Sequence, residues 1–345
     1  MLITPTMTRE PWYEKRGSIM RVVVDETYAS NITDETKFWL SDYPMLAAVQ
    51  AGNAEIPAAQ YRGIQNPNVL VYVNEDRLAP EGIQNVVVNG VAQEIVLKDV
   101  SGNNNWYCPQ EFQAEKISYT RNFKQQTRIG YSRGWESLAL PFAVQTITHQ
   151  DKGVIAPFGS DASDLHFWLR RLTHSGLQAV QTIEANTPYI ISMPNSYEYP
   201  ERFNLSGQVT FAAENVTVPQ TVDVTDESEE FIMAPAFQSM TIQPDIYALN
   251  VGEKREYYAA GSVFERNYRD VRPFEAYTMH KGTSPAPMYF IIGENTDDNT
   301  TDILEVRSQA EDGNGEWFTL DGRKLQNTPT TKGVYIQNGR KVIVK

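Results

Sequence analysis

The stretch "NVVVNGVAQEIVLKDV", residues 85–100, joins short apolar runs through a tight-turn signal. Asn89 and Gly90 separate the first two runs, and both residue types tolerate the positive φ that the central positions of a type I′ turn require. The runs are rich in valine and isoleucine, whose branched side chains pack well on a pleated surface. The stretch therefore predicts a β-hairpin that leads into a further strand.

Similar runs recur along the chain, in the manner of antiparallel strands in β-sandwiches. They are "NVLVYV" (68–73), "KISYTR" (116–121), "SLALPFAV" (137–144), "PYIISM" (188–193), "QVTFAA" (208–213), "MYFIIG" (288–293) and "GVYIQ" (333–337). The pattern lacks the alternation of strands and helices that a parallel α/β sheet needs. We therefore expect a mostly β fold of antiparallel, sandwich-like domains with a small C-terminal β module.

One segment, residues 34–52, predicts a helix. Asp34 is a suitable N-cap and Gly52 a suitable C-terminal stop. Pro44 lies between them and should kink or split the helix, because proline removes a backbone donor. The expected fold therefore includes one short N-terminal helical segment.

Changes in composition divide this 345-residue chain, which is longer than a single core usually allows. Residues 293–316 are polar and acidic with few apolar side chains, as in a linker. A second change lies near residue 115. We expect an N-terminal segment with a short helix at 1–58, a β-rich module at 59–115, a β-sandwich at 116–292, an acidic linker at 293–316 and a basic β-hairpin module at 317–345.

The charge and the single cysteine narrow the classes of function. The net charge is −13, with a pI near 4.9. Nucleic acids and anionic membranes attract basic surfaces, so we expect neither as a partner. Cys108 has no activating neighbour in sequence, which predicts a buried structural thiol. We find no apolar run as long as the about 20 residues of a membrane-spanning helix.

Motifs that carry chemistry are missing from the sequence. It contains no G-x-S-x-G elbow, P-loop or G-x-G-x-x-G, and its four histidines lack the spacing of a zinc site. "DDNTTDILE" (297–305) alternates oxygen ligands, but Asp302 stands where a calcium loop needs glycine. We therefore expect no enzyme, no cofactor and no metal. A glycosidase-like carboxylate pair that no motif marks remains an alternative.

Aromatic side chains are the remaining candidates for binding. In "HFWLRRL" (166–172), alternation places His166, Trp168 and Arg170 on one polar face of a strand. Trp106 lies in the asparagine-rich loop "NNNWYCP", where we expect it to be exposed. Exposed tryptophan on a β-sheet suits a carbohydrate platform or a protein-binding patch. The candidate ligand-binding residues are therefore Trp106, Trp168, His166 and Arg170.

The C-terminal tail "WFTLDGRKLQNTPTTKGVYIQNGRKVIVK" carries six Lys or Arg and one acidic residue. It resembles the C-terminal sorting domains of type IX secretion, which end many exported Bacteroidetes proteins. Within the match, the residues that the resemblance implies for export or attachment are Asp321, Gly322, Arg323, Lys332, Gly333, Tyr335, Gly339 and Lys341. The resemblance implies a secreted or outer-surface, extracytoplasmic protein. Residues 1–17 contain no signal-peptide core, so an exported protein would be represented here by a mature form or a fragment.

The body of the chain is similar, over about residues 65–290, to a group of uncharacterised β-rich surface proteins from Bacteroides-like bacteria. Motifs such as "GWESLALPF" and "ANTPYIISM" carry this resemblance, which supplies no catalytic residues and implies that the N-terminal 60 residues are the stub of a longer parent. We expect a non-enzymatic surface protein that binds a glycan or a protein partner. The alternatives are a structural spacer of a larger surface protein and a carbohydrate-active enzyme with an unmarked carboxylate pair.

Overall fold

The fold is known from a computed structural model of the whole chain, and it is mostly β, with 41% strand and 7% helix. This confirms the predicted fold class. The chain forms two compact units, Met1–Val306 and Arg307–Lys345. The structure describes residues 12–26, 40–100, 104–129, 132–252, 259–282, 289–292, 300–301, 303–306, 317–319, 324–325, 329–330, 333–337 and 340–344.

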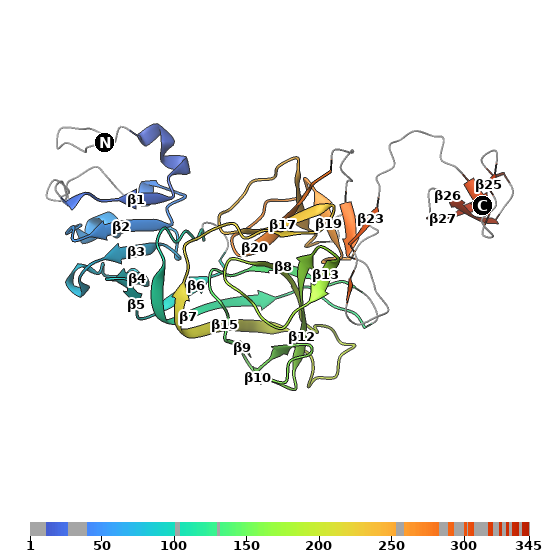
Figure 1. The fold of residues 1–345 in the computed structure, drawn as a ribbon, viewed down its shortest axis with the longest axis horizontal. Coiled ribbons are helices and arrows are strands. Elements are labelled where there is room, and N and C mark those ends of the chain that lie inside the picture. The colour runs from blue at the N-terminus through green and yellow to red at the C-terminus, as the bar shows by residue number, and fades with distance from the viewer. Residues whose placement is uncertain are drawn as a thin grey trace. The chain divides into compact units, whose positions relative to one another are not determined.

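The first sheet begins with a stack of parallel strands (Figure 1). β1 (Arg21–Val23), β2 (Ala48–Gly52), β3 (Leu70–Val73) and β4 (Asn85–Val88) pair in chain order. Among the described residues, the connections between these strands contain short helical turns, namely η2 (Leu40–Asp42), α2 (Ala58–Tyr61) and η3 (Asp76–Leu78). A further short turn, η1 (Tyr13–Ser18), precedes β1. The sequence pattern did not predict parallel pairing, because it lacks the regular alternation of strands and helices by which such pairing is usually recognised.

The predicted helix at 34–52 is wrong where the structure describes it. Residues 40–42 form the 3₁₀ turn η2 and residues 48–52 form strand β2, while 34–39 lie outside the described residues. The apolar run Leu46–Ala51 is almost wholly buried, as in a strand covered on both faces. Gly52 ends that strand with a φ of 58°, so its conformational freedom serves a strand end.

The rest of the first sheet mixes parallel and antiparallel pairs. Asn89 and Gly90 have φ values of 48° and 81°, and Val88 pairs with Val91, which confirms the predicted hairpin from β4 to β5 (Val91–Ala92). β6 (Ile95–Lys98) pairs with the long β7 (Phe112–Phe123). β7 also pairs with β5 and with β15 (Gly207–Val218), and the sheet ends at β9 (Thr146–His149) and β10 (Gly153–Val154).

Two further sheets complete the first unit. The second has the order β22 (Thr300–Thr301), β13 (Gly176–Ala179), β12 (His166–Thr173), β14 (Pro188–Ser192) and β8 (Glu136–Ala139), with β11 (Ala156–Pro157) beside β12. The third has the order β16 (Asp226–Glu227), β17 (Phe231–Ala236), β20 (Glu275–His280), β18 (Ile246–Leu249), β19 (Val263–Arg266), β21 (Tyr289–Ile292) and β23 (Ile303–Val306).

The second sheet lies between the other two. One core cluster joins its Phe167 and Ile191 to residues of the first sheet, such as Tyr119. Another joins its Leu172 to residues of the third sheet, such as Tyr247. Each face of the middle sheet therefore has its own apolar core, and the first unit holds together as stacked layers.

The expected boundaries differ from this arrangement in two places. The boundary near residue 115 lies inside β7, and one core contains residues from both sides of it. The segment 293–316, expected to be a linker, includes β22 and β23, which pair with β13 and β21. In both places paired strands lie within a stretch whose composition suggested a break.

The second unit contains a four-stranded antiparallel sheet in its described residues. Its order is β25 (Lys324–Leu325), β24 (Trp317–Thr319), β26 (Gly333–Gln337) and β27 (Arg340–Val344). β26 and β27 pair from Gly333 with Val344 to Gln337 with Arg340, which confirms the predicted C-terminal hairpin. Residues 338–339, which join these two strands, lie outside the described residues.

Candidate functional site

Strand β12 presents the two faces that its sequence predicts. Phe167 and Leu169 are buried in the core shared with the first sheet, while His166, Trp168 and Arg170 point the other way and stay partly exposed. Leu172 lies on this second face and is covered by the third sheet. That cover leaves the His166 end of β12 partly open to solvent.

An aromatic strip runs across this open end, and we define it as Phe158, His166, Trp168 and Tyr199. The ring of Phe158 lies 5.2 Å from the ring of His166 and 5.2 Å from that of Trp168. Trp168 in turn lies 6.5 Å from Tyr199. Phe158 is 44% exposed, so the strip offers an apolar ring face to solvent.

The loop after β14, which carries Tyr199 of the strip, holds two further exposed rings. Tyr197 is 93% exposed and Phe203 is 42% exposed. The guanidinium of Arg202 lies 5.3 Å above the ring of Phe203 and 3.7 Å from the carboxylate of Asp164. Glu198 fixes the loop by accepting a 2.9 Å hydrogen bond from the backbone N–H of Ile129. Charged groups therefore border exposed rings along this surface.

Two polar groups within the strip are buried or partly buried. The Nδ1 atom of His166 is buried and has no hydrogen-bond partner among the described residues. Burial raises the pKa of the Tyr199 hydroxyl, so this group stays protonated at neutral pH. Arg170 stacks over Trp135 at 5.0 Å, which fixes a cation beneath this face of β12.

Trp106, the other predicted platform residue, is fully buried, and the expectation that it is exposed is wrong. Its backbone N–H donates to Phe237 O at 2.7 Å. The loop is bonded inside the protein: Asn105 Oδ1 accepts from the Ser239 N–H at 2.7 Å, and the Asn104 carbonyl accepts from Asn68 Nδ2 at 2.9 Å. Because short amide side chains can pair with buried backbone groups, an asparagine-rich loop can be interior.

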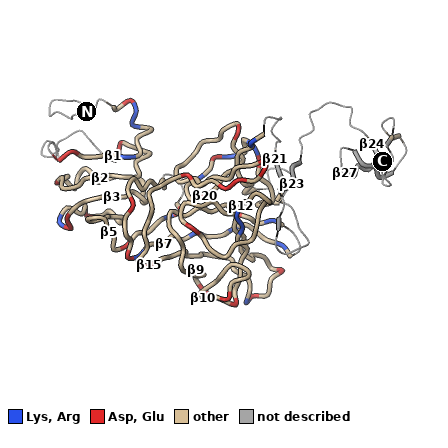
Figure 2. The backbone as a smooth tube through the Cα atoms, in the orientation of Figure 1, with Lys and Arg blue, Asp and Glu red and all other residues tan. Residues whose placement is uncertain are grey.

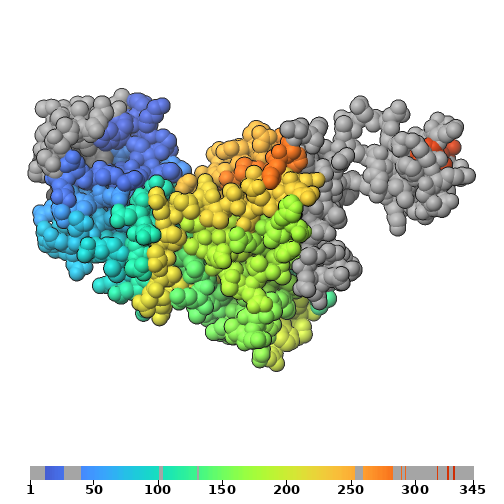
Figure 3. All heavy atoms as spheres, viewed as in Figure 1, coloured from blue at the N-terminus to red at the C-terminus, as the bar shows by residue number. Residues whose placement is uncertain are grey.

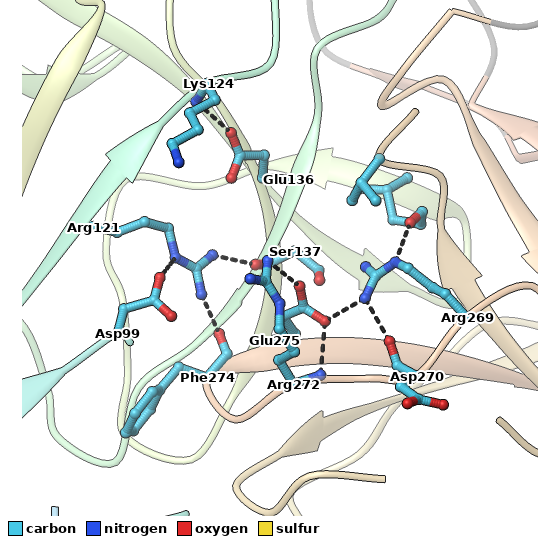
Figure 4. Close-up of polar contacts among 12 residues, drawn as sticks. Asp99, Arg121, Lys124, Glu136, Ser137, Arg269, Asp270, Arg272, Phe274 and Glu275 are labelled. Carbon is cyan, nitrogen blue, oxygen red and sulfur yellow. Dashed lines mark hydrogen bonds and ion pairs between the residues drawn. The ribbon is translucent and has the colours of Figure 1, made fainter. Parts of the chain in front are cut away.

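A buried cluster of charges joins the three sheets (Figure 4). Arg121 on β7 is 6% exposed, and its Nη1 and Nη2 donate to Ser137 O at 2.7 Å and to Phe274 O at 3.1 Å. Its Nε donates to Tyr119 Oη at 2.8 Å and to Asp99 Oδ2 at 3.2 Å. Sequence reasoning missed this cluster, although Arg121 continues the apolar row of β7, a signal of a buried charge.

The carboxylates of this cluster have structural partners. Glu275 accepts hydrogen bonds from Arg269 Nη1 at 2.7 Å and from the Arg272 N–H at 2.9 Å. Burial alone would raise the pKa of Glu275, but these cations and the N–H lower it below its usual value. Burial raises the pKa of Glu136, which accepts from the Lys124 N–H at 3.1 Å. Both carboxylates therefore serve to satisfy neighbouring donors.

Cys108 matches its predicted role as a buried thiol. Its sulfur donates to Gln110 O and lies 3.4 Å from the Tyr72 hydroxyl. Burial raises the pKa of the thiol to about 11. Cys108 is therefore protonated and unreactive in the folded protein at neutral pH.

Three of the residues implied in export lie on described strands, Gly333 and Tyr335 on β26 and Lys341 on β27. The others, Asp321, Gly322, Arg323, Lys332 and Gly339, lie outside the described residues. Within the described part of the chain, no helix has the length and hydropathy to cross a membrane, and no three potential ligand side chains are placed to hold a metal ion.

Comparisons with known proteins provide no relative from which a function could be proposed. No protein-family model, no curated protein and no solved structure matches this chain.

Proposed function

We propose that the chain is a non-enzymatic binding protein that takes a glycan on the aromatic strip. The observation that carries the proposal is the exposed ring of Phe158 stacked against His166 and Trp168. Sugar rings present C–H faces that pack against such a platform, and their hydroxyls need polar partners at its border. The exposed side chains of Asp164 and Arg202 supply those partners.

The resemblance of the C-terminal tail supports a surface or secreted location for this activity. A spacer role needs no such platform, so the strip favours binding over a spacer. A protein partner could also use exposed aromatic rings, and the experiment below separates the two.

The test is a glycan-array screen of the full chain, followed by titration of any ligand found. Phe158→Ala and Trp168→Ala remove rings of the strip, whereas Tyr13→Ala removes a partly exposed ring from η1 and is the matched control. Each strip variant should weaken binding about tenfold, or ~1.4 kcal/mol, because it deletes one stacking face. Circular dichroism checks that each variant is folded.

A blank array, or a hit that all three variants bind equally, would remove the glycan proposal. Capture of a surface protein that is lost only in Phe158→Ala and Trp168→Ala would instead assign the strip to a protein partner.

A further inference from the structure

A groove lies on the first sheet, around the hairpin from β4 to β5. It is a groove of about 490 Å³, within the size range of small-molecule sites. We name it the acidic groove and define it by its lining residues: Asp76, Ala79, Gln84, Val86, Val88, Val91, Gln93, Glu94 and Glu115.

The groove forms where strand pairing is interrupted. β4 and β5 pair only through Val88 and Val91, and the chain then leaves the ladder at Gln93 and Glu94 before β6 joins β7. The start of β4 reaches β6 through a side chain, since Asn85 Oδ1 accepts from the Val96 N–H at 2.9 Å. The residues of this interruption therefore line a hollow between the strands.

The groove is lined by both valines and carboxylates. Val86 and Val88 share one face of β4, and Val91 is 42% exposed. Asp76 comes from η3, Glu94 from the connection after β5, and Glu115 from β7. The carboxylates thus come from three separate elements around three valines.

These carboxylates have no cation of their own. Among the described residues none of the three forms an ion pair, and no Lys or Arg lines the groove. Arg77, next to Asp76, is already paired with Glu75 at 2.6 Å and with Glu55. The carboxylates also do not converge, because no described group of three such side chains could hold a metal ion. A bound cation must therefore carry several separated charges.

We propose that the acidic groove binds a linear aliphatic polyamine. Its methylene segments lie along the valines while its ammonium groups reach the carboxylates, in the way that lysine stems cover apolar surface and keep their charges in water. The net charge of −13 adds a long-range attraction for such a ligand. This site is independent of the aromatic strip and of any glycan.

The test is isothermal titration calorimetry of the full chain with spermidine at low ionic strength. Glu94→Gln and Glu115→Gln should each weaken binding about threefold, the effect of one exposed ion pair, and the double variant should weaken it about tenfold. Glu111→Gln removes the same charge from an exposed residue outside the groove and should leave the affinity unchanged. Ethylenediamine, which lacks the long stem, should bind more weakly than spermidine.

Other outcomes would overturn the proposal. If Glu111→Gln weakens binding as much as Glu94→Gln, or if Mg²⁺ displaces spermidine at equal charge concentration, the attraction is only that of the net charge. If a short lysine-rich peptide binds more than about tenfold tighter than spermidine, the occupant of the groove is a peptide.

Discussion

Replacing Arg121 by methionine tests whether this buried cation holds the three sheets together. Methionine keeps an unbranched stem of similar length but deletes the guanidinium and its hydrogen bonds to Asp99, Tyr119, Ser137 and Phe274. The side chain of Arg121 is only 7% exposed, so water cannot replace those bonds without entering the core. Removing one partner of a buried, hydrogen-bonded ion pair costs about 3–5 kcal/mol.

The assay is urea unfolding followed by tryptophan fluorescence. Arg77→Met is the control, because Arg77 also forms two ion pairs but is 58% exposed, and its loss should leave the midpoint unchanged. Asp99→Asn should cost about 1 kcal/mol, since Asp99 is more exposed than Arg121 and the carbonyl acceptors keep their donor. A loss below about 1 kcal/mol for Arg121→Met would refute the reasoning.

Two further predictions concern buried ionisable groups. Burial raises the pKa of Glu136 above its unfolded value, so the ionised carboxylate opposes folding at neutral pH. Glu136→Gln should therefore raise the melting temperature at pH 7. In a series of thermal melts, this gain should vanish as the pH falls below about 4, where the carboxyl is protonated in both states. Cys108, with a pKa of about 11 and no exposed surface, should react with a thiol reagent at pH 8 only after denaturant is added; rapid labelling of the native chain would contradict its burial.

The sequence predicted those elements whose local signal agrees with their tertiary surroundings. Asn89 and Gly90 define a turn by backbone conformation alone, and β12 shows its alternation because only part of its second face is covered. The prediction of a helix over the run Leu46–Ala51 was wrong, because an apolar segment buried on both faces lacks the alternation that distinguishes a strand from a helix.

The residues of the candidate sites were likewise predictable only where a local pattern determines their position. Trp168 could be placed on a polar face by counting along a strand, but Phe158 and Tyr199 reach it from other segments, and only the fold brings them together. Trp106 was predicted to be exposed because asparagines suggest solvent, whereas here Asn105 of the same loop accepts a hydrogen bond from a backbone N–H inside the protein. The acidic groove depends on carboxylates from three elements and has no local signature.

Phe274 has a consequence for how the chain folds. It is a fully buried aromatic residue with a φ of 66°, a conformation that its neighbours must impose. Its N–H donates to Ala236 O, and its carbonyl accepts from the Ala139 N–H and from Arg121, which is 153 residues away. Closing a loop of that length is entropically expensive, and contacts of such long range slow folding. The contacts of Phe274 with Arg121 and Ala139 should therefore form last. Until they form, the sheets are folded but not yet packed together, and the apolar residues of their shared cores are exposed and can associate with other protein chains.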